Sequence, residues 1–181
     1  MIGDDIAMRK GIIRAACGFV LSALFVAGFI AGAPAALALE PGDAAPDFSL
    51  ATYDGKPFKL SDHAGKLVVL EWFNSGCPFV MKHYRSGHIQ EMQRDYAAKD
   101  VVWVTINSTN PNHIDYLDAA KAAEFAAAQR LAAAYFVSDP DGKVGKSYNA
   151  KTPPAMFVID TQGKLAYQGA LDDEADLDSN P

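Results

Sequence analysis

Cysteine is scarce in this sequence of 181 residues, which contains only Cys17 and Cys77. Two isolated cysteines do not form the paired framework that stabilises small disulfide-rich secreted domains. Basic residues are also in deficit, because 16 Lys and Arg face 22 Asp and Glu and give a net charge of −6. An acidic protein of this kind is a poor candidate for binding nucleic acid or anionic membrane surfaces, so we expect neither partner. The length suggests one domain with additions.

The first 38 residues have the composition of a targeting segment. Basic residues lie at positions 9, 10 and 14, an uncharged apolar run spans 15–33, and Ala36-Leu37-Ala38 offers a cleavage site. This order predicts a secretory signal peptide over residues 1–38 and a mature domain over 39–181, located in the periplasm or secreted. An uncleaved membrane anchor is the alternative, and it would be the domain's one connection to a membrane. Cleavage would remove Cys17 and leave a lone Cys77, which is either a buried passenger or a free reactive thiol.

Beyond the signal segment, the hydrophobic pattern alternates between strands and helices. Apolar runs at 67–73 and 101–107 are typical of strands buried on both faces. The rest of the pattern predicts hairpins over 47–60 and 155–170, helices over 78–98 and 116–133, a strand over 135–138 and a short helix ending at 148. This order indicates an α/β fold with a central mixed sheet, flanking helices and an N-terminal β-hairpin. Sites in such folds lie at the carboxyl ends of the central strands, where Cys77 is found.

Cys77 follows a predicted strand and begins a predicted helix. Backbone N–H groups at a helix start lack partners, and together with the helix dipole they favour a thiolate. Pro78 suits the first helical turn, where an N–H is not needed. These features predict a reactive thiol, whereas the alternative is a small apolar side chain that packs at the strand end.

The sequence reads Cys-Pro-Phe-Val-x-Lys-His at 77–83 and Thr-Pro-Pro-Ala at 152–155. Together these motifs resemble the thioredoxin-like superfamily, and more narrowly its peroxiredoxin-like redoxin group of the AhpC/TSA type, over residues 41–176. The resemblance implies a thioredoxin fold in which Cys77 matches the first cysteine of the Cys-x-x-Cys pair and Val80 replaces the second. It also implies that Pro154 is the cis-proline facing the cysteine, able to pair with an extended substrate. We expect substrate to contact the residues around these two (Asn74, Pro78, Phe79 and Pro153).

Glu71 interrupts the apolar run that precedes Cys77. It therefore either points to an edge of the sheet or is a buried carboxylate. Thioredoxins similarly place a buried acid six residues before their first cysteine, and Glu71 has that spacing. The resemblance thus implies a carboxylate that passes protons to and from the thiol. A structural role, with Glu71 bonded to Lys66 or to the backbone, is the alternative.

Departures from the family pattern restrict the expected chemistry. Typical peroxiredoxins have a threonine and a proline where this chain has Asn74 and Leu70, so the usual activation of peroxide is not expected. Val80 cannot resolve a mixed disulfide, so the usual dithiol reaction of thioredoxins is not expected either. Members of the group often continue into a further helix and a late Gly-Cys, and the sequence to Pro181 does not include that cysteine.

Three hypotheses remain open. The first is a thiol oxidoreductase without cofactor, in which Cys77 attacks a disulfide- or peroxide-bearing substrate and an external thiol reductant completes the cycle. The second is a binding module that kept the fold and lost the redox chemistry. The third is a copper-handling protein, since Cys77 and Met81 lie one helical turn apart, although the sequence places no third ligand and so assigns no metal site.

Other polar residues receive minor roles. Lys82 and His83 are expected to be surface or packing residues, and His113 has no evident partner in its loop. Residues 107–109 end a central strand and are expected near the site. The acidic residues near the C-terminus are expected to form a solvated tail (Asp172, Asp173, Glu174, Asp176 and Asp178).

Overall fold

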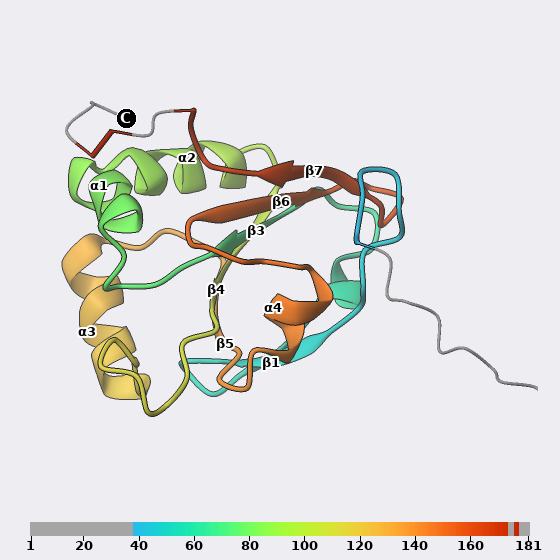
Figure 1. Cartoon of the computed structure of the whole chain (residues 1–181). Coiled ribbons are helices and arrows are strands. Elements are labelled where there is room, and N and C mark those ends of the chain that lie inside the picture. The colour runs from blue at the N-terminus through green and yellow to red at the C-terminus, as the bar shows by residue number, and fades with distance from the viewer. Residues whose placement is uncertain (1–37, 174–175, 178–181) are drawn as a thin grey trace, which may run out of the picture. The chain divides into compact units, whose positions relative to one another are not determined.

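The computed structural model describes residues 38–173 and 176–177 (Figure 1). The predicted signal peptide, residues 1–38, lies outside the described residues except for Ala38. Within the described part of the chain, no helix has the length and apolar character needed to cross a membrane.

The strands of the described residues form one mixed sheet of seven strands in the order β2-β1-β5-β4-β3-β6-β7. β3 (Val68–Trp72) lies parallel to β4 (Val102–Asn107) and antiparallel to β6 (Ala155–Ile159). β1 pairs antiparallel with β2, which confirms the predicted N-terminal hairpin, and the whole arrangement is the expected thioredoxin fold. The remaining strands are β1 (Ser49–Thr52), β2 (Pro57–Lys59), β5 (Tyr135–Ser138) and β7 (Leu165–Gly169), of which β2 and β7 form the edges of the sheet.

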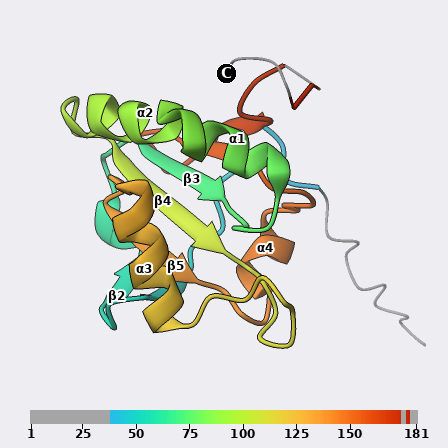
Figure 2. The same ribbon diagram turned by 90° about the vertical axis from the view of Figure 1, so that its left-hand side faces the viewer.

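Helices cover both faces of this sheet (Figure 2). One face is covered by α1 (Pro78–Ser86), α2 (His88–Ala97) and α3 (Ala119–Gln129). The other face is covered by α4 (Lys143–Ser147). A short 3₁₀ helix, η1 (Leu60–His63), follows β2.

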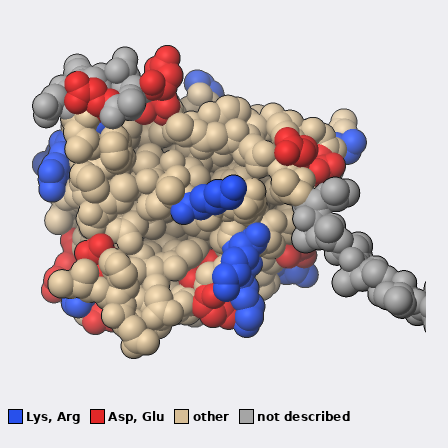
Figure 3. All heavy atoms as spheres, viewed as in Figure 1, with Lys and Arg blue, Asp and Glu red and all other residues tan. Residues whose placement is uncertain are grey.

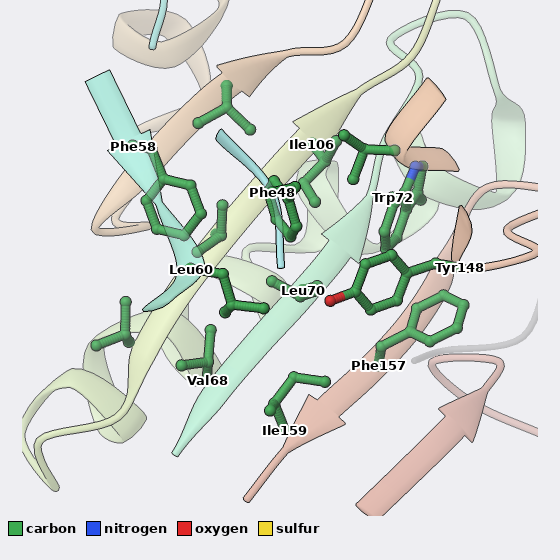
Figure 4. Close-up of a cluster of buried hydrophobic side chains, with 14 of the residues drawn as sticks. Phe48, Phe58, Leu60, Val68, Leu70, Trp72, Ile106, Tyr148, Phe157 and Ile159 are labelled. Carbon is green, nitrogen blue, oxygen red and sulfur yellow. The ribbon is translucent and has the colours of Figure 1, made fainter. Parts of the chain in front are cut away.

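Side chains of β3 alternate between two hydrophobic clusters, one on each face of the sheet. Leu70 and Trp72 join the cluster on the α4 face, which Figure 4 shows. Val69 and Phe73 join the cluster beneath α1, α2 and α3. A strand buried on both faces has a fixed register, because a slip by one residue would exchange the two sets of side chains. This register determines where β3 ends and therefore where Cys77 lies.

The helix predicted over 78–98 is instead two helices, because Gly87 ends α1. Gly87 has φ +83°, in the left-handed region, and its N–H donates to the Tyr84 carbonyl at 3.3 Å. Glycine adopts this conformation without the steric cost that a Cβ would bring. The apolar pattern continues across the break, so periodicity alone did not reveal it.

The helix predicted over 116–133 is shorter at both ends than expected. Asp118 caps α3, since its carboxylate accepts a hydrogen bond from the Lys121 N–H at 2.8 Å. Arg130 ends the helix in a left-handed conformation, with φ +53°. The alanine-rich composition favours helix throughout, and the caps set its actual limits.

Replacing Gly87 with alanine should lower the free energy of unfolding by about 1 kcal/mol, because a left-handed backbone costs an L-residue that much. A Cβ at Gly87 would meet no atom within 4 Å, so the loss comes from the backbone alone. Urea denaturation followed by circular dichroism measures the change. Arg85→Ala, an exposed substitution in the same helix, should change stability by less than about 0.5 kcal/mol. Equal stability of the Gly87→Ala variant and the wild type would contradict the prediction.

Candidate functional site

Cys77 occupies the junction between β3 and α1. It is the N-cap of α1, Pro78 is the first helical residue, and the Met81 N–H donates to the Cys77 carbonyl at 3.0 Å. The side chain is half-buried and forms no disulfide. The first N–H groups of a helix have no partner within it, so the positive end of the helix dipole lies beside this residue. The predicted position of Cys77 at a helix start is confirmed.

The Cys77 sulfur contacts the segment that precedes β6. Its thiol donates a hydrogen bond to the Pro153 carbonyl, with 3.2 Å between sulfur and oxygen. The pairing of Trp72 with Ala155 across β3 and β6 brings the two segments together. The peptide bond between Pro153 and Pro154 is cis, as the resemblance implies.

Pro153 and Pro154 limit how this segment can pair with a bound chain. Antiparallel pairing normally uses both an N–H and a C=O of the same residue. Neither proline has an N–H, so the segment offers carbonyl groups only. A backbone docked here must therefore supply the donors.

The turn before Cys77 is held by contacts with the loop that follows β4. The Asn74 side chain donates to Thr109 Oγ1 at 3.0 Å and accepts from the Gly76 N–H at 2.7 Å. Asp115 lies so close to Gly76 that a Cβ at Gly76 would clash with its carboxylate. Sequence reasoning missed Asp115, because no spacing or motif relates this loop residue to Cys77.

A pocket of about 330 Å³ opens beside Cys77 at the carboxyl ends of β3 and β4. Its walls come from residues 72–74, from 108–110 after β4, from 150–153 before β6, and from His113. The expected contribution of 107–109 is confirmed for Ser108 and Thr109, while Asn107 is not among the lining residues. The pocket lies where the sheet topology predicts a site.

The residues predicted to contact substrate fall into two groups. Asn74 and Pro153 line the pocket. Pro78 and Phe79 lie outside it, exposed on the first turn of α1, where Phe79 is 39% exposed. A substrate that reaches the sulfur can thus meet a pocket of mixed polar and apolar lining on one side and the apolar side chains of Pro78 and Phe79 on the other.

Glu71 is buried at the centre of a hydrogen-bond network beneath α1 and α2, with 1% of its surface exposed. Its carboxylate accepts hydrogen bonds from Tyr84 and Trp103 at 2.8 Å, from Thr105 at 3.0 Å and from Gln93 at 3.3 Å. Burial raises the pKa of Glu71 from its ordinary value of 4.5, although the four donors act in the opposite direction. Every oxygen of this buried carboxylate is therefore hydrogen-bonded.

The structure excludes two of the alternatives for Glu71. An edge position is wrong, because β4 and β6 flank β3. A bond to Lys66 is also wrong, because Lys66 pairs with Asp100 at 2.7 Å. Among the described residues, no hydrogen bond joins Glu71 to Cys77, so its role in proton transfer stays a prediction.

Lys82 and His83 connect α1 to the segment that follows β7. Their side chains are 6% and 2% exposed and lie 3.3 Å and 3.2 Å from the Asp172 carboxylate, respectively. Lys82 also donates to the Asp176 carbonyl at 3.1 Å. Burial lowers the pKa of His83, and the neighbouring Asp172 opposes this shift. Both residues are thus packing residues, and the expectation of a solvated tail is wrong for Asp172.

His113 has a partner that the sequence did not indicate. Its Nδ1 accepts a hydrogen bond from the Asp115 N–H at 3.2 Å and lies 3.6 Å from the Asp115 carboxylate. The described residues contain no cluster of three or more His, Cys, Asp or Glu able to hold a metal ion. The structure therefore adds no such cluster to the pair of sulfur atoms on Cys77 and Met81.

Residues 40–180 match the Redoxin family. Thioredoxin-like protein YneN of Bacillus subtilis (strain 168) is 27% identical over 127 residues, which are 70% of this chain and 69% of that protein. A solved structure of a candidate thiol:disulfide interchange protein DsbE from Chlorobium tepidum is 30% identical, with a TM-score of 0.60 over 74% of this chain and 86% of that chain. The exposed lipoprotein thioredoxin Etrx1 of Streptococcus pneumoniae strain TIGR4 is 27% identical, with a TM-score of 0.57 over 71% of this chain and 92% of that chain.

The raised pKa of Glu71 predicts a pH-dependent difference between the wild type and Glu71→Gln. A carboxyl whose pKa is higher when folded holds its proton more tightly in the folded state. Its contribution to stability is complete below the unfolded value of 4.5 and is lost as pH rises through the folded value. Glutamine resembles the protonated acid and does not titrate. The stability of Glu71→Gln relative to wild type should therefore increase as pH rises from about 4 to 7, by at most about 1.4 kcal/mol per pH unit.

Urea denaturation at several pH values measures this difference. Glu91→Gln is the matched control, because it makes the same chemical change at an exposed residue of α2. Its stability should follow that of the wild type within about 0.5 kcal/mol. A constant difference between Glu71→Gln and wild type across this range would contradict the raised pKa.

Proposed function

This chain belongs to the Redoxin family, and we propose that it is an extracytoplasmic thiol–disulfide oxidoreductase that works through a single cysteine. One observation carries the proposal. The half-buried Cys77 thiol lies at the start of α1, 3.2 Å from the Pro153 carbonyl and beside a pocket lined by both polar and apolar residues. A helix start stabilises a thiolate, and the thiolate is the form that attacks a disulfide.

Two observations support an extracytoplasmic location. The sequence pattern of residues 1–38 is that of a signal peptide. Similar solved proteins are described as a thiol:disulfide interchange protein DsbE and as an exposed lipoprotein thioredoxin. Disulfide substrates persist in such compartments, whereas cytosolic thiols are kept reduced.

In the proposed reaction, the Cys77 thiolate attacks one sulfur of a substrate disulfide. The substrate S–S bond breaks, a new S–S bond forms to Cys77, and the other half leaves as a thiolate with the electron pair. The thiolate of an external thiol then attacks the mixed disulfide, forms a disulfide with the bound half and releases the Cys77 thiolate. The external thiol is required because Val80, which is 1% exposed, occupies the position of a resolving cysteine.

The neighbours of Cys77 orient the reactants in this proposal. The Pro153 carbonyl has two lone pairs, so it can accept a substrate N–H beside or in place of the Cys77 thiol. Pro154 follows that carbonyl and has no N–H of its own, and Phe79 offers an exposed apolar contact. Glu71 acts as a positioning residue, since its bond to Tyr84 ties α1 to β3 and it reaches the sulfur only through that helix.

Formation of a mixed disulfide at Cys77 tests the proposal. In a full chain carrying Cys17→Ser, Cys77 is the only thiol, so mass spectrometry reports on it alone. Incubation with bis(hydroxyethyl) disulfide at neutral pH should give one adduct per chain, faster than on a free cysteine, and added thiol should reverse it. Cys77→Ser in the same background should give none.

Met81→Leu is the control for the copper hypothesis. Met81 is 9% exposed and leucine has a similar volume, so the fold should persist while the second soft ligand is lost. Disulfide exchange should continue at the wild-type rate. Absence of any adduct on wild-type Cys77, in protein shown to be folded, would refute the oxidoreductase and favour the redox-silent binding module.

A further inference from the structure

Some of the polar groups that line the pocket beside Cys77 have hydrogen-bond partners within the protein, and others have none. Ser108 Oγ accepts from Trp72 Nε1 at 3.1 Å and donates to Asp139 at 2.6 Å. The amide oxygens of Asn74 and Asn110 accept from backbone N–H groups at 2.7 Å and 2.9 Å. The side-chain acceptors around this pocket are therefore largely occupied by bonds within the protein.

The groups left without partners are donors or hydroxyls. Among the described residues, the Lys151 ammonium and the Thr152 hydroxyl have no hydrogen-bond or ion-pair partner, and both line the pocket. The Asn110 amide nitrogen also has none, and Thr109 Oγ1 only accepts, from Asn74 at 3.0 Å. His113 accepts at Nδ1, so the neutral ring carries its proton on Nε2. A ligand that completes the bonds of Lys151, Asn110 and His113 must supply acceptors, whereas the Pro153 carbonyl in the same pocket takes a donor.

Charge on this face favours the same kind of ligand. The protein is acidic overall, with a net charge of −6. Figure 3 shows basic side chains over α4 and the loop that leads from it to β6, with acidic side chains directly beside those over α4, where Lys143 pairs with Asp141. Lys151 lies in that loop, and α4 lies against the pocket, since a Cβ at Gly145 would be 3.2 Å from Ser108 Oγ.

We propose that this pocket binds a carboxylate carried by the disulfide substrate, with Lys151 as the residue that determines the preference. This inference rests on the proposed function and names its substrate class: a disulfide with an anionic carboxylate arm. Trp72 and Phe73 supply apolar surface for the methylene groups that join a carboxylate to the sulfur. A volume of about 330 Å³ lies at the lower end of the range for ligand pockets and is large enough for one arm of a small disulfide.

One carboxylate near the sulfur acts against this preference. Asp115 lies against Gly76 and faces His113 at 3.6 Å, but it is not among the residues that line the pocket. Lys151 lines the pocket directly and has no carboxylate partner among the described residues. A second carboxylate, Asp139, lies behind the pocket wall and accepts hydrogen bonds from Ser108 Oγ and from the N–H groups of Val144 and Gly145. Both carboxylates repel a bound anion, and Lys151 is the only Lys or Arg among the lining residues that offsets this repulsion.

Three disulfides of similar size and different charge test the proposal: dithiodipropionate, bis(hydroxyethyl) disulfide and cystamine. Rates of adduct formation are measured for the full chain carrying Cys17→Ser, with and without Lys151→Gln. The intrinsic reactivity of each disulfide cancels in the ratio of wild-type to variant rates. Lys151→Gln should slow the reaction of dithiodipropionate about threefold to tenfold at low ionic strength and leave the neutral disulfide unchanged. Lys151→Glu should slow the reaction of dithiodipropionate further and accelerate the reaction of cystamine.

Lys164→Gln is the matched control, because it removes an exposed lysine near the opposite end of β6 and should leave all three rates unchanged. About 0.5 M salt should remove most of the effect of Lys151, since it shortens the range of charge interactions. Equal loss for all three disulfides, or no loss, would overturn the carboxylate site while the oxidoreductase stands. Failure of all three disulfides to react with wild-type Cys77 would instead overturn the oxidoreductase, and the carboxylate site with it.

Discussion

The pairing of β3 with β6 determines which groups meet at the sulfur. Trp72 lies opposite Ala155, so the residues that follow β3 and those that precede β6 emerge at the same end of the sheet. Cys77 and Pro153 come from these two segments and lie 3.2 Å apart. Burial of β3 on both faces fixes this register, because a shift by one residue would bring Glu71 into the apolar cluster on the α4 face. The hydrophobic core therefore sets the geometry of the reactive site.

β3 also contains a buried carboxylate, and hydrogen bonds from neighbouring elements offset the unfavourable free energy of burying it. A buried carboxylate is unfavourable unless it is hydrogen-bonded, and Glu71 accepts four bonds from residues of α1, α2 and β4. These bonds tie both helices to the sheet, through Tyr84 in the last turn of α1 and Gln93 in α2. Loss of Glu71 would leave four donors without an acceptor, which explains why a structural role is sufficient for this residue.

The sequence was enough to predict the order of strands and helices, the hairpin at the N-terminus and the place of Cys77, since apolar runs and turn residues determine these features. It was not enough for the break at Gly87, which depends on one backbone conformation. It also could not reveal Asp115 beside Gly76, or the contacts of Lys82 and His83 with Asp172, because these pairs are distant along the chain. The pocket donors Lys151 and Thr152 belong to a loop with no motif, so only the folded structure identifies them.

The two segments that meet at the Cys77 sulfur present different groups to a bound chain. The start of α1 presents N–H groups that have no partner within the helix, whereas the Pro153 carbonyl accepts a bond from the thiol, with 3.2 Å between sulfur and oxygen. Because Pro153 and Pro154 provide no N–H themselves, a chain that pairs with their segment has to supply the donor. The carbonyl that would hold a docked backbone is therefore the same group that contacts the sulfur, so docking and access to the sulfur are linked.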